Sequence, residues 1–142
     1  MKLGFATRKS FTGLIVSLLA VLGVFAAPAV SQASTSAAYP VTSFRLEYGA
    51  TVLAGSITWY NRNIGIVGSL RARSSGKQAH FRAGSASCSS AATTGTVPAD
   101  TTGSFDIGMN CDFPGGFTWV TVQLWDASGT YLDGVTCTRD GC

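Results

Sequence analysis

The sequence has few of the side chains that catalysis requires. Its 142 residues include one histidine, His80, and one glutamate, Glu47. Active sites bring a base, a nucleophile or a metal ion together, yet no serine stands in a GxSxG turn. The six aspartates fall mostly at expected turns or strand exteriors, which does not suit the paired carboxylates of a glycosidase. We therefore expect no catalytic residue, and we rank a hydrolytic enzyme third among the candidate functions.

Patterns typical of metal and cofactor sites are also missing. The sequence has no CxxC pair and no cluster of histidines, so we expect neither a zinc site nor a cofactor. Asp126, Ser128, Thr130 and Asp133 place oxygen atoms at alternating positions, as a calcium loop would. That stretch is too short and too poor in carboxylates for a helix-loop-helix calcium site. Hairpin-turn chemistry explains it without an ion, so we expect no metal.

The chain has no net charge once its first 33 residues are set aside. The formal charge of +3 equals the contribution of Lys2, Arg8 and Lys9, which leaves seven cations and seven anions in the rest of the chain. Nucleic-acid-binding domains normally carry a surplus of positive charge. We therefore expect no nucleic-acid partner.

Residues 1–33 have the layout of a secretory signal peptide. Three cations come first, an apolar run follows, and small residues close the segment. Cleavage is expected after Ala29 or Ala33, and we favour Ala33 because a proline beside the other bond hinders most peptidases. The alternative is an uncleaved membrane anchor, since no charged residue lies between residues 11 and 30.

The remaining chain has the size of one domain. We expect a flexible N-terminal segment over 34–40 and a single domain over 41–142. A cleaved leader predicts a secreted, extracellular protein with no stable membrane insertion, and we expect it to be a monomer.

Four cysteines in a short secreted chain predict two disulfides. Three pairings are possible. We favour Cys88 with Cys111 and Cys137 with Cys142, because each closes a short segment; the alternative joins Cys111 to Cys137 and Cys88 to Cys142. On the loop-entropy model, the favoured pairs stabilise the fold by about 3.5 and about 2 kcal/mol.

Apolar and polar residues alternate along seven segments, with the period of a β-strand. In residues 41–48, for example, Phe44 and Leu46 share one side and Arg45 lies on the other. Residues 85–103 are nearly all small or polar and are predicted to form the longest loop. The other strands are expected at 51–60, 64–73, 78–85, 104–111, 117–125 and 130–137.

Seven short strands separated by turn signals, with no capped helical stripe, indicate an all-β domain. We predict a single antiparallel β-sandwich of immunoglobulin-like or jelly-roll-like size with two disulfides; the alternative is a small β-barrel. No cysteine precedes Trp59 where the inter-sheet bridge of an immunoglobulin domain would need it. The resemblance is therefore to an architecture only.

Two turns are predicted near the middle of the chain. Asn61–Asn63 suits a turn because asparagine tolerates left-handed backbone and its side chain bonds nearby amides. Residues 74–77 are expected to turn the chain into a hairpin that sets Arg73 opposite Gln78 and Arg71 opposite His80.

That hairpin would gather a basic patch on its outward side. The patch consists of Arg71, Arg73, His80 and Arg82, and guanidinium groups suit a phosphate or carboxylate partner such as a wall polymer. The alternative interpretation is that Asp106, on the next strand, pairs with Arg82 and neutralises the sheet.

The segment GGFTWVTVQLWDASG, residues 115–129, has two apolar sides. One side is an uninterrupted aliphatic row, so we predict that it faces the core. Thr121 and Gln123 interrupt the other side between Trp119 and Trp125. Exposed tryptophans beside hydrogen-bonding side chains form a surface on which sugar rings stack. The alternative is that the predicted long loop or a partner sheet covers them.

The function predicted from these features is a secreted, non-catalytic domain that binds an extracellular glycan, a wall polymer or a protein. The candidate ligand-binding residues are Trp119, Gln123 and Trp125, with the basic patch as a second surface. The alternative is a small secreted, disulfide-stabilised inhibitor or interaction module that docks through residues 89–103 or through the turn at residues 60–63.

Overall fold

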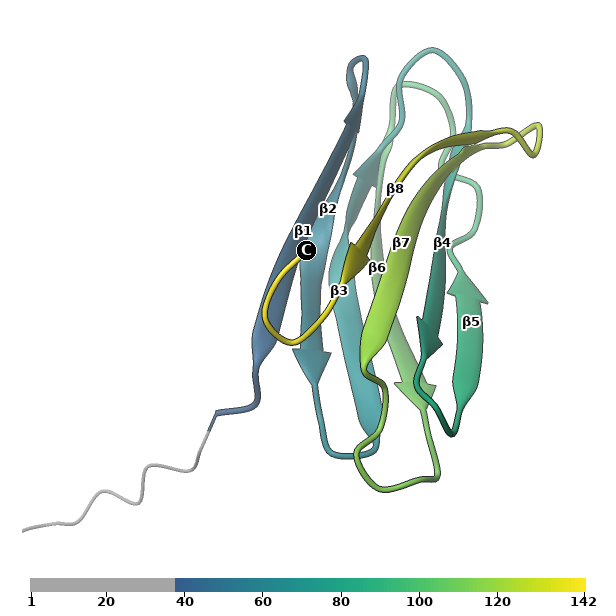
Figure 1. Ribbon diagram of the computed structural model, residues 1–142. Helices are drawn as coiled ribbons and strands as arrows, with labels where there is room; N and C mark the ends of the chain where they lie inside the picture. Colours follow the sequence, from purple (N-terminus) through teal and green to yellow (C-terminus); the bar gives the residue numbers. More distant parts are fainter. Residues whose placement is uncertain (1–37) are drawn as a thin grey trace, which may run out of the picture. The chain divides into compact units, whose positions relative to one another are not determined.

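Residues 38–142, which the computed structural model describes, form eight antiparallel strands and no helix (Figure 1). The predicted leader, both cleavage positions and most of the predicted flexible segment lie outside the described residues. Within residues 38–142, no helix is long and apolar enough to cross a membrane. The strands are β1 Val41–Tyr48, β2 Thr51–Trp59, β3 Asn63–Arg71, β4 Lys77–Gly84, β5 Ser89–Thr93, β6 Thr102–Asn110, β7 Trp119–Asp126 and β8 Tyr131–Cys137.

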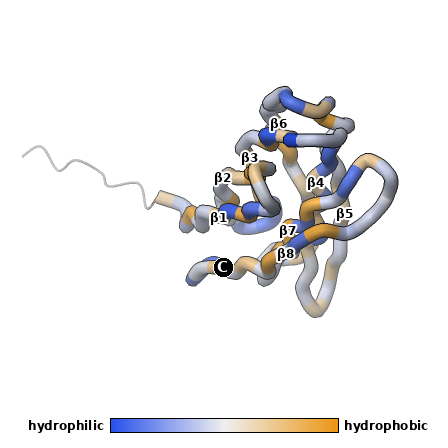
Figure 2. The backbone as a smooth tube through the Cα atoms, turned by 90° about the horizontal axis from the view of Figure 1, so that it is seen from above, coloured by the Kyte–Doolittle hydropathy of each residue, from blue (hydrophilic) through white to orange (hydrophobic). Residues whose placement is uncertain are grey.

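The strands form two four-stranded sheets that pack as a sandwich, as predicted. One sheet has the order β1-β2-β3-β6 and the other the order β5-β4-β7-β8. We call them sheet A and sheet B. Figure 2 views the strands end-on and shows the two layers. The chain crosses between the sheets three times, after β3, after β5 and after β6, so strands distant in sequence become neighbours, such as β4 and β7.

Apolar and polar residues alternate along the strands, and the apolar ones form the core. Ile57, Ile66, Phe81 and Leu124 face inward and are fully buried, while their neighbours in sequence face outward. The predicted aliphatic row of β7 is likewise inaccessible to solvent, which confirms that it faces the core. These inward side chains come from both sheets and form one hydrophobic cluster.

Two glycines on the inner face of sheet A leave space for aromatic rings in the core. Gly55 and Gly68 lie opposite each other in β2 and β3, on the inward side of sheet A. The rings of Phe44 and Phe105 lie over them: a Cβ atom on Gly55 would stand 2.8 Å from the Phe44 ring, and one on Gly68 would stand 2.7 Å from the Phe105 ring. Phe81 of sheet B contacts both rings, with centroid distances of 6.2 and 5.3 Å. The missing side chains of sheet A therefore make room for three phenylalanines.

The disulfides join Cys88 to Cys111 and Cys137 to Cys142, which confirms the favoured pairing. The first bridge links the turn after β4, in sheet B, to the end of β6, in sheet A. The second closes the C-terminal segment on itself. Two disulfides are typical of extracellular proteins.

Two predictions about connections were wrong. The predicted long loop, residues 85–103, contains the edge strand β5, and Val97 within it forms a backbone bridge with Lys77. Residues 89–103 are therefore not one free loop. The predicted hairpin at residues 74–77 does not form either, because β3 and β4 belong to different sheets and the chain crosses the sandwich there.

Candidate functional site

The outer face of sheet B brings together residues that the sequence placed on two separate patches. In the antiparallel register of β4 and β7, Gly84 lies opposite Trp119, Arg82 opposite Thr121, and His80 opposite Gln123. Residues paired directly across a sheet point to the same face. Hence Trp119, Gln123 and Trp125 share one surface with His80 and Arg82.

The other two arginines of the predicted basic patch lie elsewhere. Arg71 ends β3 in sheet A, where it is paired with Val52 and Thr102. Arg73 lies in the connection after β3, and its guanidinium forms an ion pair with Asp100 at 2.9 Å. The patch is not formed as predicted, because it depended on a hairpin between β3 and β4.

The neutralising partner proposed for Arg82 is also absent from sheet B. Asp106 lies in β6 of sheet A, opposite Val67. The outward positions of β4 and β7 hold Arg82 and His80 without any carboxylate. The face is therefore positively charged at Arg82.

Trp119 is the more accessible of the two outward tryptophans. The residue is 37% exposed. Its indole lies against Gly84, and the ring atom Cε2 is 2.7 Å from the position that a Cβ atom on Gly84 would take. Beside it is a hollow of about 230 Å³, lined by the indole, Arg82, Ala83 and residues 89–91 of β5. The segment expected to cover Trp119 instead runs alongside β4 as a strand, so it forms one wall of this hollow.

Trp125 is half-buried within a row of rings. Its indole stacks on His80, with centroids 5.0 Å apart and an angle of 20° between the planes, and it meets Tyr131 edge-on at 5.7 Å. Its Nε1–H donates a hydrogen bond of 3.2 Å to Oε1 of Gln123. One indole face and the indole N–H are thus already engaged.

Partial burial lowers the pKa of His80 below its usual value, so the stacked imidazole is neutral at neutral pH.

A second charged cluster, formed by Lys77 at the start of β4 and Asp126 at the end of β7, has a structural role. The ammonium group of Lys77 is buried and bonds to the carbonyl oxygens of Arg73 and Ser75 and, at 3.3 Å, to the carboxylate of Asp126. The Ser75 hydroxyl, the backbone N–H of Ser128 and Lys77 all hold the pKa of Asp126 well below its usual range. The cluster ties the β3–β4 connection to the β7–β8 turn, and it occupies the carboxylate that the sequence offered as a calcium ligand.

Comparisons of the chain with protein-family models, with curated proteins and with solved structures found no match.

Proposed function

We propose that this protein is a secreted, non-catalytic domain that binds an extracellular glycan or cell-envelope polymer on the outer face of sheet B. The observation that carries the proposal is the hollow between Trp119 and Arg82. It combines an exposed indole, a guanidinium with no ion-pair partner among residues 38–142, and the small side chains of β5.

The chemistry of the hollow suits a sugar unit. An indole face packs against the C–H groups of a pyranose ring, while a guanidinium and serine hydroxyls bond to its oxygen atoms. Arg82 also suits a carboxylate or phosphate group on the polymer, because its fork of N–H donors matches such groups. Trp119 is therefore the primary stacking residue of the proposal, and Trp125 and Gln123 extend the surface along β7.

The arrangement of the face favours a polymer over a small molecule. Trp119 and Trp125 stand at opposite ends of β7, six residues apart, which corresponds to ~20 Å along an extended strand. A single sugar reaches only one of them. A chain of several sugar units could follow β7 and contact both ends.

Co-sedimentation with insoluble polysaccharides and purified cell walls tests the proposal. We expect the native protein to be retained and Trp119→Ala to lose at least about tenfold in affinity, which corresponds to about 1.4 kcal/mol. Tyr48→Ala is the matched control, because Tyr48 is an exposed aromatic residue at the end of β1 in sheet A. Equal losses for both variants, or full retention of Trp119→Ala, would contradict the proposal.

The role of Arg82 has its own readout. If Arg82 contacts an acidic group of the polymer, Arg82→Gln weakens binding, and the difference from the native protein shrinks as salt screens the charge. Arg71→Gln, at the exposed end of β3, is the control that changes the net charge equally. A loss that is the same at every salt concentration indicates instead that Arg82 bonds to neutral hydroxyl groups.

A further inference from the structure

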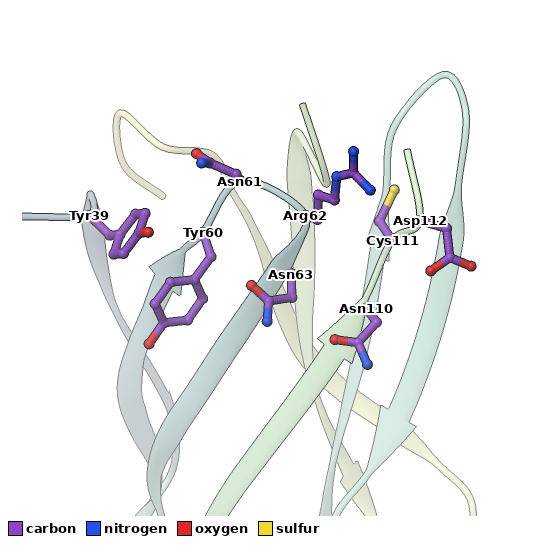
Figure 3. A pocket seen from close by; sticks show the side chains of 8 residues that line it. All are labelled: Tyr39, Tyr60, Asn61, Arg62, Asn63, Asn110, Cys111 and Asp112. Carbon is purple, nitrogen blue, oxygen red and sulfur yellow. The ribbon is translucent and has the colours of Figure 1, made fainter. Parts of the chain in front are cut away.

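A larger hollow lies on the other sheet, where the β2–β3 turn meets the end of β6 (Figure 3). Its volume is about 480 Å³, and we call it the turn pocket. Figure 3 shows Tyr60, Asn63 and Asn110 arranged across the ends of β2, β3 and β6, with Arg62 and Asp112 beside them. None of the outward residues of sheet B takes part in it, so the pocket is a separate feature of the molecule.

The asparagines are the first sign of a binding site. The chain contains three, Asn61, Asn63 and Asn110, and all three line the turn pocket. Asn63 and Asn110 lie directly opposite each other in the register of β3 and β6. Two carboxamides from strands far apart in sequence are thus placed side by side.

The usual structural reasons for asparagine do not apply here. The sequence suggested that Asn61 and Asn63 serve the turn, but neither has a positive φ, and the turn is closed by a backbone bond of 2.9 Å from Tyr60 N–H to the Asn63 carbonyl. Within residues 38–142, none of the three carboxamides forms a hydrogen bond. Each keeps two N–H donors and an oxygen acceptor free for a ligand.

Two tyrosine rings form one side of the pocket. The Tyr60 ring stands beside Gly65, 3.5 Å from where a Cβ atom would be, and Tyr39 packs against it edge-on with centroids 4.8 Å apart. The two rings therefore form the aromatic side of the pocket, next to the asparagine pair. A sugar ring can pack against this side while its hydroxyl groups bond to the carboxamides.

The charges in the pocket indicate a neutral ligand. Arg62 and Asp112 contribute one charge of each sign, and neither side chain has an ion-pair partner among residues 38–142. An anion or a cation would meet a like charge as well as an opposite one. Neighbouring hydroxyl groups, which both donate and accept, match the mixture of carboxamide, guanidinium and carboxylate.

The pocket is also held in place. The backbone N–H of Cys111 donates a hydrogen bond of 2.7 Å to the Arg62 carbonyl, which joins the turn to the end of β6, and Cys111 is bridged to Cys88. A preformed site loses less entropy when a ligand binds. We infer that the turn pocket binds a neutral pyranose sugar, and this inference does not depend on the proposed role of sheet B.

Titration with soluble trisaccharides, followed by two-dimensional NMR of the backbone amides, tests this inference. The probes are maltotriose, cellotriose, xylotriose, mannotriose and triacetylchitotriose. We expect at least one of them to shift the amides of residues 61–63 and 110–112 in a saturable manner. The affinity should change less than about twofold as salt rises from about 0.05 to about 0.5 M, because no net charge is paired.

Matched variants decide whether the pocket is the site. We expect Asn63→Ala with Asn110→Ala to weaken binding at least about tenfold, and Arg62→Ala to weaken it measurably. Arg71→Ala is the control for Arg62, because Arg62 directly precedes β3 and Arg71 ends it, so both are exposed arginines at opposite ends of the same strand. The spectra of the variants report whether they remain folded, and Arg62→Ala changes an exposed side chain, so the test does not rely on the double variant alone.

Three results would overturn the inference. They are the absence of saturable shifts with all five sugars, equal affinity of the native and Asn63→Ala plus Asn110→Ala proteins, and shifts confined to the strands of sheet B. Trp119→Ala separates the two proposals. It should leave trisaccharide binding to the turn pocket unchanged while it weakens binding to insoluble polymers at least about tenfold.

Discussion

The two sheets present similar inner faces and very different outer faces. Facing the core, both carry large apolar side chains that pack into one cluster. On the outside of sheet A, the β3–β6 pair carries no aromatic side chain: Gly65 lies opposite Gly108, Val67 opposite Asp106 and Ser69 opposite Ser104. On the outside of sheet B, the β4–β7 pair carries two tryptophans, a histidine and an arginine.

Folding constrains the inner faces of the two sheets much more than their outer faces. Burial of the inner faces drives folding, because removing apolar surface from water is the main favourable contribution. The outer faces gain little from it, and sheet A shows that a strand pair of this sandwich, β3 with β6, forms without outward aromatic side chains. The indole of Trp119 is partly exposed beside Arg82 in a hollow, and apolar rings next to a few polar groups are typical of binding sites. Sheet B therefore presents an aromatic surface, and the end of sheet A presents a polar pocket.

The largest predicted change in stability comes from adding a methyl group to the inner face of sheet A, and the same change on its outer face is the control. Gly68→Ala should lower the free energy of unfolding by about 3 kcal/mol, because the new methyl group would enter the space of the Phe105 ring and the neighbouring backbone. Gly108→Ala on the outer face meets no atom within 4 Å and should change stability by about 0.5 kcal/mol or less. Urea unfolding measures both, and similar losses would show that the glycine pair does not define the core.

A smaller effect is expected where sheet B uses a glycine on its outside. Gly84→Ala should displace the indole of Trp119 and cost about 1–2 kcal/mol of stability. The displaced indole should become easier to quench with acrylamide, whereas Trp59 stays buried. Ser89→Ala, across from Gly84 on β5, is the control. Unchanged quenching in Gly84→Ala would mean that the glycine does not seat the indole.

The smallest predicted effect is the pH dependence of the stability that His80, on sheet B, contributes. Burial lowers the pKa of His80 in the folded protein, so the unfolded chain takes up a proton at a higher pH than the folded one does. The stability that His80 contributes is therefore fully present above about pH 6.5 and declines as the pH falls below that value.

Unfolding at a series of pH values measures this contribution. Relative to the native protein, His80→Gln should gain stability as the pH falls from about 7 to about 5. Asn110→Ala, in the turn pocket of sheet A, should parallel the native protein over the same range because it removes no titratable group. A constant difference between the native protein and His80→Gln would show that His80 does not titrate differently in the folded state.

The strands themselves were predictable because alternation is a local property. The row Val120, Val122 and Leu124 was expected to face the core, and all three are fully buried. Strand β5 was missed because its residues, SSAAT, are small and show no contrast between apolar and polar positions. Nothing in that stretch distinguishes an edge strand from a loop.

The candidate surfaces were harder to predict than the strands. Trp119 and Gln123 were identified from one segment, because outward aromatic and polar residues alternate with aliphatic ones within it. The arginine that lines the same hollow comes from β4, and the sequence grouped it with Arg71 and Arg73 through a hairpin that does not form. The turn at residues 60–63 was predicted only as a possible protein-docking element, and Asn110 was interpreted as an ordinary strand residue. The hollow that joins them was therefore not predicted.

The sequence alone therefore determined the all-β class and the inward side of most strands, and it favoured the disulfide pairing that the structure has without excluding the alternative. These features depend on the two-residue period of a strand and on short chain segments. Tertiary structure alone decided which strands are neighbours. By pairing β4 with β7 and β3 with β6, it placed Arg82 near Trp119 and Asn63 beside Asn110. Such pairings join residues far apart in the chain, and they follow from how two apolar faces close over one core, which no single segment specifies.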